Sequence, residues 1–242
     1  MEPLHYKNAK FYSMKLLVFD TSTSILGIAL LQGEKTSFIQ EEGGAQASET
    51  LIPLIAHILQ QDSLKITDLD AIAFGCGPGA FTGLRTACSV AQGLAMGAQL
   101  PVIPIVTLLA GAEEARLKQA ALNNYIGASE VLVQLDARMN EWYWAHYTWS
   151  PENAWQTIAE PALSSPEVLQ AYIQNVAQNK APVNQLTQVT VEGPQLQGML
   201  SLAKHAWENQ QTVTPDQALP LYLRNKVALT TAEREALHKS KV

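Results

Sequence analysis

The stretch Gly75-Cys76-Gly77-Pro78-Gly79-Ala80-Phe81-Thr82-Gly83-Leu84-Arg85 joins an apolar run to a strongly helical segment. Its glycines permit positive φ angles and close backbone approach, and Thr82 is placed to cap the helix. Free amide groups at a helix start attract anions. The spacing matches neither the dinucleotide-binding fingerprint nor a phosphate loop ending in Gly-Lys-Ser/Thr. The stretch is therefore either a cradle for phosphate or carboxylate, or a tight turn that lets the helix lie against a sheet.

The helix after this loop is built for close packing. Gly83, Ala87, Ala91 and Ala95 recur every four residues, so one face of the helix is nearly smooth. Leu84, Val90, Leu94 and Met96 lie off that row and leave few positions for water.

The first ordered segment, residues 15–20, is an apolar run that ends at Asp20 and is followed by the hydroxyls of residues 21–24. This pattern predicts a buried strand that ends in a polar turn. The turn either lies near a bound phosphate or metal, or is satisfied by its own side chains. Strands over 25–31 and 34–41 follow, with Gln32-Gly33 as a hairpin turn.

Residues 48–59 predict a helix capped by Ser48 or Thr50, with Pro53 in or near its first turn. Its leucines and isoleucines cover the side toward a sheet, and Ile52 and Ala56 remain apolar on other sides. We expect a partner surface here, since an apolar patch of this size is seldom left in water. A lone histidine on this helix, His57, is expected in the core or an interface.

The order of elements repeats along the chain. Three strands, a helix, a strand (70–74), a helix, a strand (101–106) and a helix (107–117) are followed by strands over 131–136 and 141–149, a helix (166–176), a strand (189–191) and a helix (195–207). A polar stretch, 119–130, separates the halves. We expect lobes over 14–118 and 119–223, an extension over 1–13, a basic tail over 224–242, and last helices that cross back to the first lobe.

Composition narrows the function classes. The chain has 242 residues, 47% hydrophobic and 16% charged, which predicts a globular protein. The sequence contains no run of about twenty apolar residues and no secretion signal at its start, so a cytoplasmic protein without a membrane partner is expected. Its two cysteines, Cys76 and Cys88, are expected to be free buried thiols, and no zinc spacing is present.

Charge is unevenly distributed along the chain. The net charge is −6, but residues 1–15 carry +2 and residues 224–242 carry +3, so the eight basic and nineteen acidic residues between them sum to −11. Nucleic-acid binding needs a basic footprint. The body is therefore not expected to hold RNA by itself, and the tail is either a solvated end or a tRNA contact.

Four motifs together resemble one family. They are Asp20-Thr21-Ser22-Thr23, the glycine loop from Gly75 to Arg85, Asp136-Ala137-Arg138-Met139-Asn140-Glu141-Trp142-Tyr143-Trp144-Ala145, and Pro220-Leu221-Tyr222-Leu223-Arg224-Asn225. As a set they closely resemble the bacterial TsaB (YeaZ) family, over residues 14 to about 228. The family often has histidine where this chain has Ala47, whose side chain cannot make the polar contacts of a histidine.

The resemblance implies an α/β fold with two lobes, actin-like and sugar-kinase-like (ASKHA, RNase H-like), with duplicated βββαβαβα-type subdomains. It also implies a non-catalytic subunit for threonylcarbamoyladenosine (t6A) formation next to the tRNA anticodon, working with TsaD and the ATPase TsaE, self-associating when alone, and meeting tRNA only through the complex. No catalytic residue, metal or required cofactor is expected, and at most weak ATP or ADP binding.

Three groups of candidate residues follow. The vestigial phosphate cleft comprises Asp20, Thr21, Ser22, Thr23, Gly77, Gly79 and Thr82. The expected partner interface comprises Leu51, Leu54, Ile55, Ile58, Gly83, Ala87, Ala91 and Leu94. Family-motif residues without an assigned role are Arg85, Asp136, Arg138, Glu141, Tyr222 and Arg224.

An alternative is a stand-alone small-molecule kinase or ATPase of the same fold. Such an enzyme needs metal-holding carboxylates at both phosphate turns and a second glycine turn. Only Asp20 and the loop over 75–83 are candidates. A peptidase lacks support because neither a Ser-His-Asp set nor His-Glu-x-x-His appears.

Overall fold

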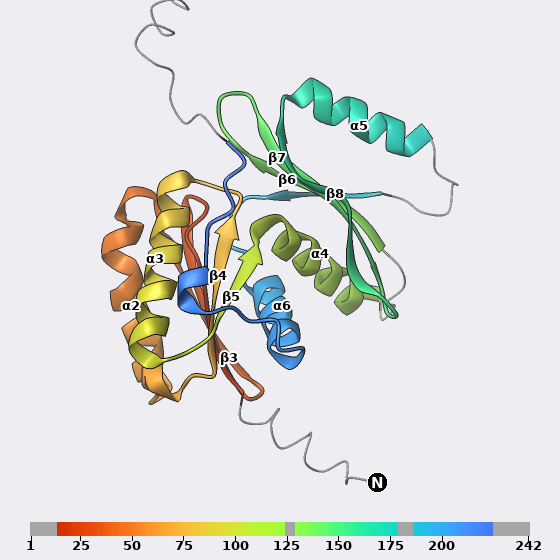
Figure 1. Cartoon of the computed structure of the whole chain (residues 1–242). Coiled ribbons are helices and arrows are strands. Elements are labelled where there is room, and N and C mark those ends of the chain that lie inside the picture. The colour runs from red at the N-terminus through yellow and green to blue at the C-terminus, as the bar shows by residue number, and fades with distance from the viewer. Residues whose placement is uncertain (1–13, 124–128, 179–185, 225–242) are drawn as a thin grey trace, which may run out of the picture.

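The computed structural model describes residues 14–123, 129–178 and 186–224, in which two β-sheets lie on either side of a layer of two helices (Figure 1). The extension over 1–13 and the tail beyond Arg224 lie outside the described residues. None of the helices that the structure describes is long and apolar enough to cross a membrane.

The first sheet has the strand order β3-β2-β1-β4-β5. Its strands are β1 (Lys15–Asp20), β2 (Ile25–Gln32), β3 (Lys35–Glu42), β4 (Ala71–Gly77) and β5 (Val102–Val106). β1 pairs antiparallel with β2 and parallel with β4, and β4 pairs parallel with β5. The hairpin turn between β2 and β3 is Gly33-Glu34, one residue later than predicted, with Gly33 at φ 63°.

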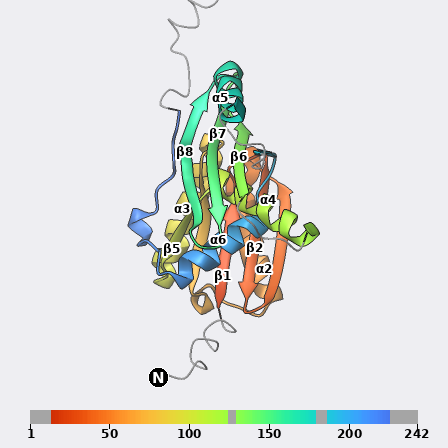
Figure 2. The ribbon, with the colours of Figure 1, turned by 90° about the vertical axis from the view of Figure 1, so that its right-hand side faces the viewer.

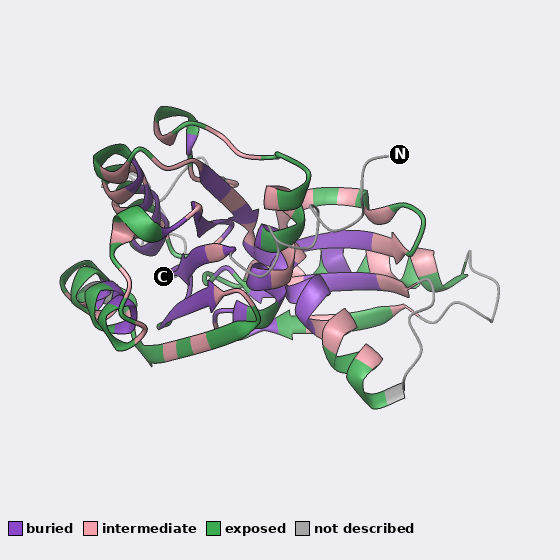
Figure 3. Cartoon of the chain, turned by 90° about the horizontal axis from the view of Figure 1, so that it is seen from below, coloured by how far each residue is buried: buried purple, intermediate pink, exposed green. Residues whose placement is uncertain are grey.

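Side chains alternate across β1, as the period of a strand requires. Leu17 and Phe19 point into a core with helices α2 (Ala47–Gln61) and α3 (Phe81–Ala98), while Leu16 and Val18 point into a core with α6 (Leu196–Glu208). The strand is therefore covered on both faces, which explains why its apolar run is nearly continuous. In Figure 3 the central strands of the sheets are drawn mostly in purple, the colour of buried residues.

The small residues of α3 lie where the sequence predicted close packing. Ala87, Ala91 and Ala95 have no exposed surface, and they belong to the core under α2 and α3. The caps differ from expectation: α2 begins at Ala47 after Gln46, α3 begins at Phe81 after Ala80, and neither has a side-chain cap. Thr82 and Ser48 are therefore helical residues rather than caps.

The second sheet has the order β8-β7-β6-β9. Its strands are β6 (Ser129–Asp136), β7 (Trp142–Ser150), β8 (Ala154–Ser164) and β9 (Thr187–Val191), and α5 (Pro166–Gln178) lies on its outer face (Figure 1). Strand β8 was not predicted, because its mixed polar sequence at the edge of the sheet gives no long apolar run.

Helices α4 (Thr107–Asn123) and α6 form the layer between the sheets, which Figures 1 and 2 show from two sides. α4 packs on the second sheet through Leu108 and Ala112, and α6 packs on the first sheet. The predicted return of a late helix to the first lobe is thus confirmed. Gly198 allows the close approach, since a Cβ there would lie 2.3 Å from the carbonyl oxygen of Ala110.

The two-lobed actin-like architecture is confirmed, with one difference between its halves. The first half reads βββαβαβα, and the second half reads βββαβα within the described residues. After α6, the chain returns to the first sheet, where Val213 bridges to Val102, and a short 3-10 helix, η3 (Pro215–Gln217), leads into residues 218–224. The lobe boundary at residue 119 remains a prediction.

Candidate functional site: the cleft between the lobes

All four sequence motifs meet at a single cleft of about 700 Å³ between the lobes. The first lobe contributes residues 22–24 after β1 and 79–81 at the start of α3. The second lobe contributes residues 135–139, at the end of β6 and just after it, and the end of β9. The chain segment 221–224 forms a further wall. The topology therefore brings the ends of β1, β4 and β6 to one place, as expected for this type of fold.

Asp20 ends β1 but does not reach the cleft. Its side chain is 1% exposed, and its two carboxylate oxygens accept hydrogen bonds from the Ser22 amide (2.7 Å) and the Ser22 hydroxyl (2.9 Å). Burial raises the pKa of Asp20, although the bonds from Ser22 oppose that shift. Gly75 makes room for the carboxylate, since a Cβ at residue 75 would lie 2.5 Å from it. The turn is satisfied by its own side chains.

The glycine loop packs against that same turn. A Cβ at Gly83 would lie 1.8 Å from the carbonyl oxygen of Thr21, and the Thr21 hydroxyl donates to the carbonyl of Gly83 at 2.7 Å. The Ala80 amide donates to the carbonyl of Ser22 at 2.7 Å, and a Cβ at Gly79 would lie 2.6 Å from Ser22. These glycines permit close contact of two chain segments. Of the two readings of the loop, the contacts favour the tight turn.

The predicted phosphate-cleft set divides into two parts. Ser22, Thr23 and Gly79 line the cleft. The other four residues do not line it: Asp20, Thr21, Gly77 and Thr82. The first three of those are buried, and Gly77 has φ 114°.

The family-motif residues form two clusters, each of which includes residues that line the cleft. In the first, the Arg85 guanidinium stacks 3.9 Å from the Phe81 ring centre, and its Nε donates to the Tyr222 hydroxyl at 3.3 Å. In the second, Arg224 makes an ion pair with Glu141 and approaches the carbonyl of Arg138 at 3.5 Å.

The loop from Asp136 to Glu141 has an unusual backbone. Arg138, Met139 and Asn140 have φ angles of 64°, 57° and 57°, and the Asp136 carboxylate accepts a hydrogen bond from the Arg138 amide at 2.7 Å. Three successive non-glycine residues in the left-handed region are costly unless their surroundings hold them. Such strain is typical of functional loops.

The expected partner-interface residues lie mostly inside the protein, which corrects that set. Six of them are buried in the first lobe, and the five that have a side chain are no more than 3% exposed: Leu51, Ile55, Ile58, Gly83, Ala87 and Ala91. Leu54 and Leu94 are half-buried against that core. The large hydrophobic side chains of these helices that are exposed are instead Ile52 (52%) and Met96 (66%). His57 is also exposed and contacts Gln61 at 3.0 Å, so of the two places expected for it the core is wrong and the interface stays a prediction.

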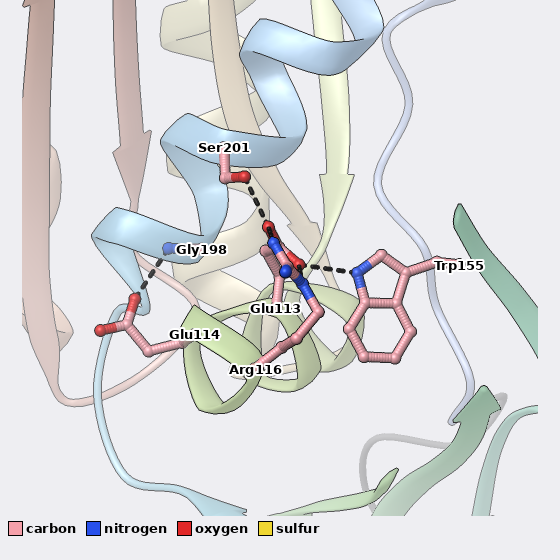
Figure 4. Close-up of polar contacts among 6 residues, drawn as sticks. All are labelled: Glu113, Glu114, Arg116, Trp155, Gly198 and Ser201. Carbon is pink, nitrogen blue, oxygen red and sulfur yellow. Dashed lines mark hydrogen bonds and ion pairs between the residues drawn. The ribbon is translucent and has the colours of Figure 1, made fainter. Parts of the chain in front are cut away.

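A buried polar network between the lobes was not predicted. Glu113 on α4 accepts hydrogen bonds from Arg116 Nε and Nη2 (2.7 Å each), Trp155 Nε1 on β8 (2.8 Å) and Ser201 on α6 (2.5 Å) (Figure 4). Burial alone raises the pKa of Glu113, but these donors outweigh it and hold the pKa below its usual value. The sequence signal for this network is the pair Glu113-Glu114, which stands in the otherwise mostly apolar first part of α4.

The two cysteines are free thiols in the core of the first lobe. Cys76 and Cys88 are free and buried, as expected, and burial raises the pKa of Cys76 to about 12. A thiol with such a pKa is inert at neutral pH.

In the parts of the chain that the structure describes, no three histidine, cysteine, aspartate or glutamate side chains are grouped so that they could hold a metal ion.

Comparisons with known proteins place the chain in one family. The profile of a family described as "TsaD: tRNA N6-adenosine threonylcarbamoyltransferase" matches residues 34–234. The "tRNA threonylcarbamoyladenosine biosynthesis protein TsaB" of Escherichia coli is 32% identical over 89% of this chain and 96% of its own length. The protein of the same name in Haemophilus influenzae is 36% identical over 89% of this chain and 95% of its length.

A solved structure agrees with these relatives. "YeaZ from Pseudomonas aeruginosa" superimposes with a TM-score of 0.68 at 31% identity, covering 87% of this chain and all of that one. A coverage of 87% of this chain is large enough to include both lobes. The chain belongs to the TsaB (YeaZ) family.

Proposed function

We propose that this chain is a non-catalytic subunit required to form threonylcarbamoyladenosine next to the anticodon of tRNAs. It acts by binding and activating a TsaD-type catalytic subunit, together with a TsaE-type ATPase. The relatives named for this biosynthesis support the pathway. The family profile that carries the transferase description supports the type of partner.

The observation that carries the non-catalytic role is the closed turn after β1. An actin-like ATPase needs a carboxylate and free amides at this turn to hold metal and phosphates. Here both Asp20 oxygens are engaged by Ser22, and the loop over 75–83 lies against residues 21 and 22. No cofactor is required in this proposal, and ATP or ADP binds weakly at most.

The partner surface in this proposal is the outward side of α2 and α3. Ile52 and Met96 are exposed there, and Leu54 and Leu94 are half-buried beside them. Large apolar side chains on two adjacent helices suit a protein interface better than water. The same face would pair two copies of the chain when the partner is absent.

The proposal assigns tRNA binding to the complex rather than to this subunit. The region from residue 16 to 223 carries a net −11, which repels the phosphate backbone. Arg224 is engaged with Glu141 at the cleft. Lys226, Arg234, Lys239 and Lys241 lie outside the described residues, and a contact of this tail with tRNA in the complex stays a prediction.

Reconstitution with the TsaD-type and TsaE-type proteins tests the role. We expect t6A formation in tRNA only when this chain is present, and no ATP turnover by the chain alone. ATP hydrolysis by the isolated chain at about one per second or faster, abolished by Asp20→Asn, would instead establish the stand-alone kinase or ATPase.

The surface is tested separately, by light scattering with the TsaD-type protein. Met96→Asp places a charge on the exposed side of α3 and should weaken association at least tenfold without loss of folding. Gln170→Asp, exposed on α5 of the second lobe and away from α2 and α3, tests whether any added charge has this effect. Unchanged association of the Met96 variant would move the interface elsewhere. Ala87→Asp is unsuitable, because Ala87 is fully buried and its replacement tests folding.

A further inference from the structure

The last described residues, 218–224, pass from one lobe to the other and are called the C-terminal strap here. Their first part lies along α3. The carbonyl of Ala218 accepts hydrogen bonds from Gln92 Nε2 (2.9 Å) and Cys88 Sγ (3.1 Å). Tyr222 lies nearer the start of the helix, with its ring centre 5.0 Å from that of Phe81.

These contacts come from one stripe of α3. Positions 81, 85, 88 and 92 are spaced as neighbours on a single helix face, and each touches the strap. The strap is also fastened to the sheet, because the Leu221 amide donates to the carbonyl of Cys76 at 2.7 Å. In Figure 1 the blue segment after η3 follows this path up to the second lobe. The first end of the strap is thus held by side chains and backbone together.

The second end of the strap is held differently. Leu223 packs against the core of the second lobe, and Arg224 pairs with Glu141 and approaches Met139 Sδ at 3.7 Å. The Arg224 side chain is 17% exposed and that of Glu141 is 37% exposed. Glu141 follows the strained loop over 138–140. Apart from the packing of Leu223, this end is therefore held by Arg224 alone, through one partly solvated ion pair and contacts with a loop that is itself costly to hold.

We propose that the C-terminal strap is a latch that holds the cleft between the lobes closed, and that it opens at the Arg224–Glu141 end. Residues 221–224 form a wall of the cleft and reach both lobes, so a widening of the cleft must break the contacts at one end. The α3 end has a buried anchor at Ala218, two aromatic rings and a sheet hydrogen bond. The ion pair is the weaker fastening, because partly exposed pairs contribute little and are screened by salt.

The distance between the lobes tests the latch directly. Spin labels on Thr67→Cys in the first lobe and Val168→Cys on α5 occupy exposed positions, while both native cysteines are buried. Double electron–electron resonance on the full chain, diluted with unlabelled protein, reports the distance within one molecule. We expect a narrow distribution in the otherwise unchanged chain, and a broader one shifted to longer distances in Arg224→Gln and in Glu141→Gln.

Two comparisons make the result specific. The double variant should broaden the distribution no more than either single variant, because both changes remove the same pair. Lys35→Gln breaks the pair of Lys35 with Asp62 inside the first lobe and should leave the distribution unchanged. Raising the salt concentration should broaden the distribution of the chain with Arg224 and Glu141 intact. Distributions that stay as narrow in both single variants as in the starting chain, or that broaden equally in the Lys35 variant, would overturn the latch.

Discussion

Glu113→Gln should destabilise the protein far more than the same change at its neighbour Glu114 (Figure 4). The Glu113 carboxylate is 4% exposed and accepts four hydrogen bonds, two of them from Arg116. A glutamine keeps one oxygen, and its amide group then faces a donor of Arg116. The loss of one charged hydrogen bond and of the ion-pair partner is expected to cost about 3 kcal/mol.

The matched control is Glu114→Gln. Glu114 accepts a hydrogen bond from the Gly198 amide at 2.7 Å and lies 3.4 Å from the exposed Lys118 amine. A glutamine can keep its oxygen on the Gly198 amide, and the Lys118 side chain, which is 68% exposed, can move away from the new amide group, so the cost should stay below about 1 kcal/mol. Urea unfolding, followed by tryptophan fluorescence and circular dichroism, measures both changes in the free energy of unfolding.

The difference in the free energy of unfolding between the unchanged chain and Glu113→Gln should also depend on pH. Because its folded-state pKa lies below the ordinary value of 4.5, its stabilising effect is present above that value and is lost as pH falls through the folded pKa. The gap between the unchanged chain and Glu113→Gln should therefore narrow at acid pH. Equal costs for the two glutamine variants at neutral pH, or a gap that widens on acidification, would refute the reasoning.

Three further predictions concern the turn after β1 and the helix layer. Gly83→Ala should cost more than about 3 kcal/mol in urea unfolding, because its Cβ would lie 1.8 Å from the rigid backbone oxygen of Thr21; a cost under about 1 kcal/mol contradicts the close packing. Gly198→Ala should cost about 1–3 kcal/mol, since its Cβ would lie 2.3 Å from the carbonyl of Ala110; a stabilised variant, by thermal melting, speaks against that contact. Burial raises the folded pKa of Asp20, so the unchanged chain should lose stability as pH rises from 3.8 through that pKa, and Asp20→Asn should gain relative to it over the same range; a pH-independent difference in urea midpoint rules this out.

Local sequence determined most of the first lobe. The alternating and continuous apolar runs predicted β1, β2, β4 and β5 within a few residues, and the four-residue spacing of Gly83, Ala87 and Ala91 identified the buried face of α3. These signals are local because strand and helix periods place every second or every fourth side chain on one face. The motif set was sufficient to predict the family.

Tertiary structure alone decided which apolar residues are available to a partner and what the cleft contains. Leu84 and Met96 both lie off the smooth row of α3, but Leu84 is 1% exposed and Met96 is 66% exposed, since the burial of a helix position depends on the elements packed around it. Asp20 likewise ends its strand as predicted, yet both oxygens of its carboxylate accept hydrogen bonds from Ser22. The contacts of Glu113 with Trp155 and Ser201, and of Arg224 with Glu141, join residues 42 to 88 positions apart. No periodicity encodes such contacts, because they form only when the two sheets and the helices between them are assembled.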